Sequence, residues 1–266
     1  MALVAIRSGG SEPPLVCVHA RAGHVRLYQD LARHLDTNLP MYGLEAPAPN
    51  GRSAAYHDFG ELAARYAREV RSVQQHGPYR VLGECLGGPL AFELASQLRS
   101  GDERVRLVLI DTFRTGEPPL SPRVPRGVYR LVHRSRILVF HVVNLVRLRS
   151  RLSYAGERAV RALQAVRRAS SGPAAHDVGT AAFDEALAAY EPMRFGGPVV
   201  LFRATKLPLG VESAPDLGWA EVVDELEIVL VPGYFTTVVS EPHVGVLAEK
   251  LQALLAEDLA GFDLKD

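Results

Sequence analysis

Residues 81–88 carry the pattern that most constrains the fold of this chain. They read Val-Leu-Gly-Glu-Cys-Leu-Gly-Gly, an apolar run followed by G-x-C-x-G and then a helix-forming stretch. This is the nucleophile-elbow pattern, in which a sharp strand-to-helix turn exposes a nucleophile above a sheet. Gly83 and Gly87 flank the turn because only a residue without a β-carbon lets strand and helix approach so closely. We therefore expect Cys85 to be the nucleophile. The alternative, a buried structural cysteine, leaves the flanking glycines unexplained.

Short β-rich runs alternate with helical periods along most of the chain. This alternation predicts an α/β fold with a mostly parallel sheet and crossover helices, in an order that resembles the α/β-hydrolase fold. The predicted strands are Leu15–Val18, Met41–Leu44, Arg80–Gly83, Arg106–Ile110, Val199–Phe202 and Glu227–Val231. The predicted helices are Val25–His34, Phe59–Gln74 and Gly88–Leu98.

One long interruption, at about residues 115–190, breaks the alternation. It is rich in proline at first and then becomes helical and rich in arginine. A stretch this long inside an alternating fold is usually an inserted lid. We therefore expect a single domain over residues 1–266 with a helical lid insertion.

The formal charge of the chain is zero, but it is unevenly distributed. Between Ser121 and Ser170 there are twelve arginines and one acid, Glu157, so this segment carries +11 and the rest of the chain −11. An acidic partner could dock there; the alternative is a solvated helical face. Because the segment lacks interleaved aromatic residues and a helix-turn-helix signature, we expect no nucleic-acid partner.

Cysteine content and apolar runs indicate the compartment. The chain has two cysteines, Cys17 and Cys85, and Cys17 lies inside an apolar strand, so a disulfide and a metal site are not expected. The apolar run 137–146 falls short of the roughly 20 residues of a membrane helix, and the amino terminus lacks a signal-peptide pattern. We expect a cytoplasmic protein with no membrane partner.

An elbow nucleophile requires two backbone amides to bind the oxyanion. One should be the amide of Leu86, directly after Cys85. The other should come from the loop after the first core strand, with Arg21 favoured over Ala20. His19 ends that strand, and we expect it to brace the loop rather than to act as a base.

A triad also needs a carboxylate, and the strand after the elbow helix ends in Asp111. This places Asp111 at the carboxyl edge of the sheet, where ligand chemistry collects in open α/β folds. The alternative role for Asp111 is a cap on the following turn.

The sequence resembles the thioesterase domains that release products from non-ribosomal peptide and polyketide synthases. The likeness runs through PPLVCVHARAG, MYGLEAP, GPYRVLGECLGGPLAFELASQL, LVLIDT, the basic lid, GGPVVLFRAT and VPG followed by EPHVGVLAEKL. It implies an enzyme that accepts an acyl or peptidyl chain from a carrier protein's phosphopantetheine thioester and binds no cofactor of its own. It also implies that the acidic carrier protein docks near the basic lid. Serine is usual at the elbow, and cysteine is similar to what some members use.

The chain departs from the family pattern at the base. The family histidine normally sits two residues after VPG, and here that position is Phe235. His243 lies eight residues further on and is a possible displaced base. His24, His133 and His141 are weaker candidates.

Sulfur makes the loss of the histidine tolerable for acyl loading. The pKa of a thiol at a helix amino terminus can be lowered, although the charges of Glu84 and Asp111 would oppose this. Attack by water needs a general base, so hydrolysis should be slow. We expect a covalent S-acyl-cysteine on Cys85 that is released by transfer or cyclisation to an internal nucleophile, or to an amine, thiol or carbon nucleophile. The alternatives are a hydrolytic thioesterase that uses His243 and a catalytically degenerate domain that binds a carrier or acyl chain.

Overall fold

The computed structural model describes residues 2–47, 58–99, 103–116, 118–147 and 174–263. Its strands are β1 (Leu3–Arg7), β2 (Leu15–Val18), β3 (Met41–Leu44), β4 (Tyr79–Glu84), β5 (Val105–Ile110), β6 (Phe195–Lys206) and β7 (Val223–Tyr234). Its helices are α1 (Gln29–His34), α2 (Phe59–Val73), α3 (Gly88–Leu98), α4 (Arg126–Arg147), α6 (Ala174–Ala189) and α7 (Val244–Asp263). Short 3-10 turns are η1 (Arg26–Tyr28), η2 (Cys85–Gly87) and η3 (Trp219–Glu221).

The strands form one mostly parallel sheet in the order β1-β3-β2-β4-β5-β6-β7. Only β1 runs antiparallel to its neighbour, β3, among the strands that the structure describes. Glu84 pairs in register with Ile110, so β4 and β5 end side by side. Because Cys85 and Asp111 directly follow these two ends, the topology brings both to the carboxyl edge of the sheet. The predicted α/β-hydrolase fold is confirmed.

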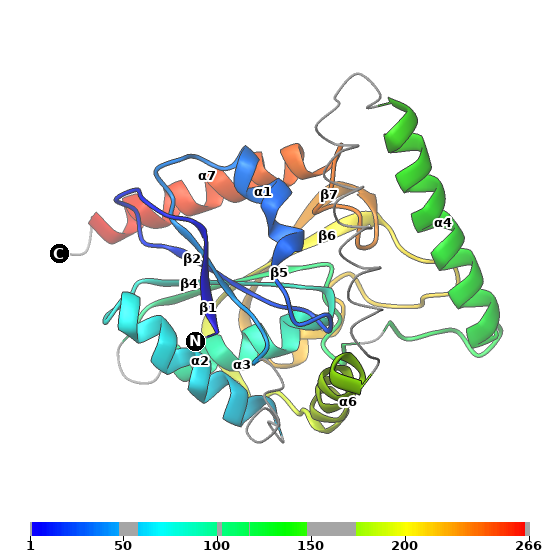
Figure 1. Ribbon diagram of the computed structural model, residues 1–266, viewed down its shortest axis with the longest axis horizontal. Coiled ribbons are helices and arrows are strands. Elements are labelled where there is room, and N and C mark those ends of the chain that lie inside the picture. Colours follow the sequence, from blue (N-terminus) through cyan, green and yellow to red (C-terminus); the bar gives the residue numbers. More distant parts are fainter. Residues whose placement is uncertain (1, 48–57, 100–102, 117, 148–173, 264–266) are drawn as a thin grey trace.

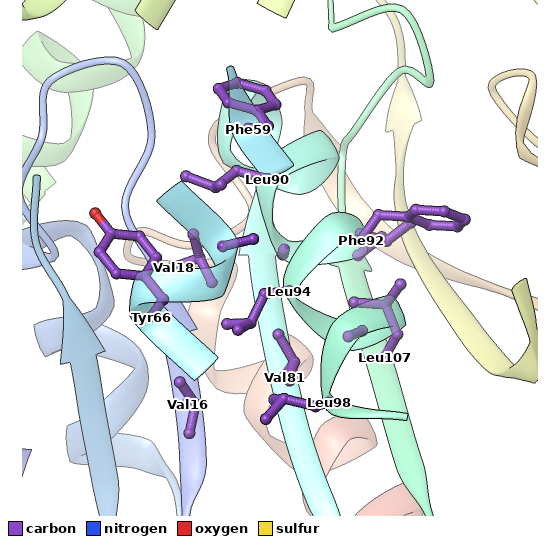
Figure 2. Packing of buried hydrophobic residues seen from close by; sticks show 14 of the residues in the cluster. Val16, Val18, Phe59, Tyr66, Val81, Leu90, Phe92, Leu94, Leu98 and Leu107 are labelled. Carbon is purple, nitrogen blue, oxygen red and sulfur yellow. The ribbon is translucent and has the colours of Figure 1, made fainter. Parts of the chain in front are cut away.

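Helices cover both faces of the sheet. α2 and α3 lie on one face, and α1 and α7 lie on the other (Figure 1). Side chains alternate along each strand, so Val81 packs under α3 whereas Leu82 belongs to the core on the opposite face. Figure 2 shows the first of these cores, in which Leu94 and Leu98 of α3 lie against Val81 and Leu107 of the sheet.

Every predicted strand is present, and four are longer than predicted: β4 and β5 by one or two residues, and β6 and β7 by more. β6 and β7 each extend to 12 residues. The predicted helices correspond to η1 with α1, to α2 and to α3. The sequence prediction missed β1, a five-residue edge strand.

The segment between β5 and β6 contains α4 and α6, in the region predicted as a lid. α4 stands beside the carboxyl edge of the sheet (Figure 1). Several apolar side chains of α4 are exposed rather than packed on the core, among them Leu131, Leu138 and Val139. Residues 148–173, which hold six of the twelve lid arginines, lie outside the described residues.

Candidate active site

Cys85 sits on a strained turn between β4 and α3. Its φ of 49° lies in the left-handed region, which is costly for a residue with a β-carbon. The turn is held by close contacts that only glycine permits. A β-carbon on Gly88 would come within 2.1 Å of the Thr112 side chain, and one on Gly83 within 2.6 Å of Ala91. The Thr112 hydroxyl also donates to the Cys85 carbonyl at 3.0 Å. The glycine pattern therefore fixes the Cys85 turn against the end of β5.

Cys85 lines a pocket of about 270 Å³ and is itself half-buried. The walls come from the elbow, from Gly116, Pro118 and Leu120, from one face of α4 and from the turn after β7. The lining side chains of α4 are Arg126, Tyr129, Arg130 and His133. The lid helix thus contributes both positive charge and an imidazole to the surroundings of the thiol.

The Cys85 thiol is neutral at neutral pH. Burial raises its pKa well above the usual value, the charge of Glu84 adds to this, and the amide of Leu86 opposes it. Burial, together with repulsion from Asp111, raises the pKa of Glu84 to about 8. Of the opposing effects on the thiol pKa that the sequence left open, desolvation outweighs the single amide hydrogen bond. Cys85 therefore needs a proton acceptor before it can attack.

The loop expected to complete the oxyanion hole packs directly against the elbow. A β-carbon on Gly87 would lie 2.7 Å from the carbonyl oxygen of His19 and 3.3 Å from the Cα of Ala20. The ring nitrogens of His19 lie 2.7 Å from the Ala20 carbonyl and 2.8 Å from the Tyr66 hydroxyl, so His19 braces this loop. Burial lowers the pKa of His19 to about 4, which keeps the ring neutral.

The side chain of Arg21 extends away from this loop and pairs with Asp184 of α6. The ion pair joins the loop between β2 and α1 to the helix that precedes β6. His19 and Ala20 thus lie next to Gly87. The donor amides expected for the oxyanion hole, those of Leu86 and of Arg21 or Ala20, remain a prediction.

Asp111 is fully buried, and its carboxylate is hydrogen-bonded to backbone amides. Its φ is 46°, and its two carboxylate oxygens accept hydrogen bonds from the amides of Ala204 at 2.6 Å and Thr236 at 3.0 Å. Burial raises its pKa to about 6 although these two amides oppose the shift. The carboxylate thereby joins the end of β6 to the turn after β7, and no imidazole of the described residues is hydrogen-bonded to it.

Phe235 occupies the turn that Asp111 holds. It is 3% exposed, and its ring centroid lies 5.5 Å from that of Phe113 and 6.2 Å from that of His133. It also lines the Cys85 pocket. An apolar ring therefore fills the position where the sequence pattern leads one to expect a histidine.

The remaining candidate histidines differ in whether they line the Cys85 pocket. The His243 ring stacks on Phe140, with centroids 5.9 Å apart, and lies next to Gly233, outside the lining of the Cys85 pocket. Its role as a displaced base remains a proposal. His133, by contrast, lines the pocket. The side chain of His141 lies outside the described residues.

Sequence reasoning gave little weight to His133 and did not assign Arg126, Tyr129 and Arg130 to the pocket. Tyr129, Arg130 and His133 lie three, four and seven residues after Arg126, so all four share one helix face. This spacing is the one sign in the sequence that they belong together. Which face of α4 meets the sheet could not be read from the sequence.

No described helix is long and apolar enough to cross a membrane. In the same part of the chain, no three or more His, Cys, Asp or Glu side chains are grouped so as to hold a metal ion.

Comparisons with known proteins show which proteins this chain is similar to. Residues 13–119 match the family model described as a thioesterase domain. A dimodular nonribosomal peptide synthase of Bacillus subtilis is 37% identical over 112 residues, which is 42% of this chain and 5% of that protein. Malpinin synthetase of Mortierella alpina is 41% identical over 122 residues, covering 44% of this chain and 2% of the synthetase. The chain thus spans only a small part of the curated relatives that it matches.

Solved structures extend the likeness in fold over nearly the whole chain. A four-domain nonribosomal peptide synthetase bound to AMP and glycine matches 95% of this chain and 20% of its own, with a TM-score of 0.72 and 24% identity. The thioesterase domain of NocB in a covalent fluorophosphonate complex matches 92% of this chain and 95% of its own, with a TM-score of 0.63 and 22% identity. Residues 13–119 are therefore similar to the thioesterase-domain family, and the chain as a whole shares its fold with these solved structures, among them the thioesterase domain of NocB.

Proposed function

We propose that this chain accepts an acyl or peptidyl group from a carrier-protein phosphopantetheine thioester onto Cys85. Release then follows by transfer or cyclisation to an amine, thiol or carbon nucleophile rather than by efficient hydrolysis. The likeness to synthetase thioesterase domains supports product release as the general reaction. The observation that carries the finer proposal is Phe235, a buried ring beside the thiol at the position of the family's histidine.

Loading exchanges one thioester for another. The Cys85 sulfur attacks the thioester carbon, the carbon–sulfur bond to the carrier's pantetheine breaks, and the carrier thiol leaves with the proton that Cys85 gave up. The two thioesters have similar energy, so this step is reversible. The strained elbow supports it by holding the sulfur at the pocket surface.

Release depends on the nucleophile. Water must be held next to a general base, and the loss of the base from position 235, where the family resemblance places it, typically costs on the order of 10² to 10⁴ in rate. A neutral amine or a thiol brings its own reactivity and loses less. The ring of Phe235, which packs against Phe113, gives the pocket an apolar wall that disfavours an ordered water at the thioester.

The pocket also carries positive charge at the lid. Arg126 and Arg130 line it from α4, one helical turn apart. Guanidinium groups bind phosphate through paired hydrogen bonds, so these side chains suit the phosphate of the carrier's prosthetic arm or the carrier's acidic surface.

A partition experiment tests the proposal. The wild-type chain is mixed with an acyl-N-acetylcysteamine thioester, with and without benzylamine, and the acid and amide products are quantified by chromatography. We expect more amide than acid in the presence of the amine, and slow formation of acid alone. Cys85→Ala supplies the uncatalysed background.

The other outcomes distinguish the alternatives. Acid as the main product in the presence of the amine would indicate a hydrolytic thioesterase, and its loss in His243→Ala would assign the base to His243. Turnover no faster than that of Cys85→Ala would indicate a domain that binds without chemistry.

A further inference from the structure

His133 places an imidazole in the Cys85 pocket from the lid helix α4. Its Nδ1 lies 3.0 Å from the Tyr234 hydroxyl, at the end of β7. Its ring stacks on Tyr129 of the same helix, with centroids 5.6 Å apart and planes 8° apart, and lies tilted against Phe235. Contacts from two separate elements therefore fix the orientation of a side chain that lines the same pocket as the thiol.

We propose that His133 replaces the family's histidine as the proton acceptor for Cys85. The inference rests on the proposed function, because it requires that Cys85 be acylated. It follows from the position of His133 in the lining of the pocket and from its hydrogen bond with Tyr234.

The other described histidines are placed less well. His19 has hydrogen-bond partners at both ring nitrogens, and His243 is stacked on Phe140 outside the pocket lining. Among the histidines whose side chains the structure describes, His133 is the one in the lining of the Cys85 pocket.

The hydrogen bond with Tyr234 suits the ring to this role. When Nδ1–H donates to the phenol oxygen, Nε2 keeps a lone pair that can accept a proton. Tyr234 then takes the orienting part that a carboxylate plays in a triad, while Asp111 is hydrogen-bonded to backbone amides.

Burial also favours a neutral acceptor. Burial lowers the pKa of His133 below its ordinary value of 6.5, so the ring is uncharged at neutral pH. Arg126 and Arg130 line the same pocket and bring positive charge to it. Cys85, whose thiol also stays neutral, faces the pocket from the elbow. A neutral thiol and a neutral imidazole in one pocket are the groups from which general-base attack starts.

The proton balance closes in both half-reactions. In loading, Nε2 takes the thiol proton as the Cys85 sulfur bonds to the thioester carbon, and then returns the proton to the departing pantetheine sulfur. In release, the incoming amine or thiol bonds to the acyl carbon while Nε2 takes its proton, the bond from the acyl carbon to Cys85 breaks, and the Cys85 sulfur recovers the proton. The apolar ring of Phe235 in the same pocket disfavours an ordered water in place of that nucleophile.

Single-turnover kinetics of three histidine variants test the proposal. Wild type, His133→Gln, His243→Gln and the exposed control His76→Gln are mixed with hexanoyl-N-acetylcysteamine, and the loading of Cys85 is followed by intact-protein mass spectrometry at pH 5 to 8. We expect His133→Gln to load about 100-fold more slowly. The wild-type rate should fall as pH drops through a pKa below 6.5, and this dependence should disappear in His133→Gln. His243→Gln and His76→Gln should retain the wild-type rate and pH profile.

Chemical rescue separates loss of a base from loss of structure. His133→Ala should regain part of the loading rate in the presence of free imidazole, whereas Cys85→Ala should remain unlabelled. Loading by His133→Gln within twofold of wild type, with an unchanged pH profile, overturns the assignment of His133 and leaves the proposed function standing. The assignment also falls if imidazole does not rescue His133→Ala. Absence of any adduct on wild-type Cys85 overturns both proposals.

Discussion

Phe235 is buried against Phe113 at the end of β7, and its ring forms part of the wall around the Cys85 thiol. The adjacent residue, Thr236, donates its amide to Asp111. A histidine at position 235 would therefore lie beside both the carboxylate and the thiol, as it does in a triad. The identity of this one residue separates a hydrolase from the transferase proposed here.

Phe235→His should increase the hydrolysis of acyl thioesters. An imidazole at this position can activate water, so we expect a rise of at least about tenfold in acid formation, within the range that a general base contributes. Chromatography of the released acid measures it, with Phe235→Gln as a polar control that cannot act as a base. An equal rise in both variants would indicate that removal of the apolar wall, and not the base, controls hydrolysis.

Glu84 makes stability depend on pH. Burial raises its pKa in the folded state from 4.5 to about 8. The stability that the protonated carboxyl contributes is therefore fully present below pH 4.5 and is lost as pH rises through about 8. Glu84→Gln carries no charge at any pH. Relative to wild type, its melting temperature should rise by several degrees between pH 5 and pH 9, because about 1 kcal/mol shifts the melting temperature of a chain of this size by about 2–4 °C. Calorimetry of both proteins checks this. The exposed Glu225→Gln is the control, and parallel wild-type and Glu84→Gln curves would contradict the burial of this carboxyl.

At the scale of elements, the elbow shows how far sequence reasoning reaches. The turn at Cys85 depends on residues within a few positions of one another, and glycine is required where strand, helix and the Thr112 side chain meet. Such local sterics can be read directly from a sequence. The strands were predicted for the same reason, since their apolar runs are local. β1 was missed because five residues at a sheet edge give a weak periodic signal.

The position of the lid helix could not be predicted in this way. His133 lines the same pocket as Cys85 only because α4 turns one particular face toward the sheet's carboxyl edge, and tertiary packing decides that orientation. The apolar residues on other faces of α4, such as Leu131 and Leu138, would have suggested a different buried side. The missing histidine was visible from the sequence, whereas the candidate replacement required the fold.

A matched pair of glycine substitutions tests the packing of the elbow. Gly88→Ala places a β-carbon 2.1 Å from the Thr112 side chain and should destabilise the chain by about 1–3 kcal/mol. Gly127→Ala in α4 meets nothing within 4 Å and should change stability by no more than about 0.5 kcal/mol. Urea denaturation of both variants measures the difference. Equal stability of the two would contradict the close contact between elbow and β5.

At the scale of the whole molecule, charge is separated between the lid segment and the remainder. The segment from Ser121 to Ser170 carries +11, and α4 presents part of that charge beside the pocket. A carrier protein with acidic helices would be attracted over distances comparable to the Debye length, about 8–10 Å at physiological salt. Docking at this surface would bring the prosthetic arm near Cys85.

Turnover of a carrier-bound substrate should therefore depend on ionic strength. We expect kcat/KM to fall several-fold between about 50 mM and 500 mM salt because the lid charges become screened. The same acyl group on N-acetylcysteamine lacks the carrier and should show little change, which makes it the control. If carrier-bound and small thioesters respond equally to salt, the assignment of carrier docking to the lid is wrong.

The lifetime of the acyl group on Cys85 tests the central claim most directly. Intact-protein mass spectrometry follows wild type after a short exposure to hexanoyl-N-acetylcysteamine and removal of excess donor. The account predicts a single added acyl mass, absent in Cys85→Ala, that persists in buffer and disappears promptly when an amine is added. An adduct that Cys85→Ala also forms, or one that water discharges as fast as the amine does, would contradict it.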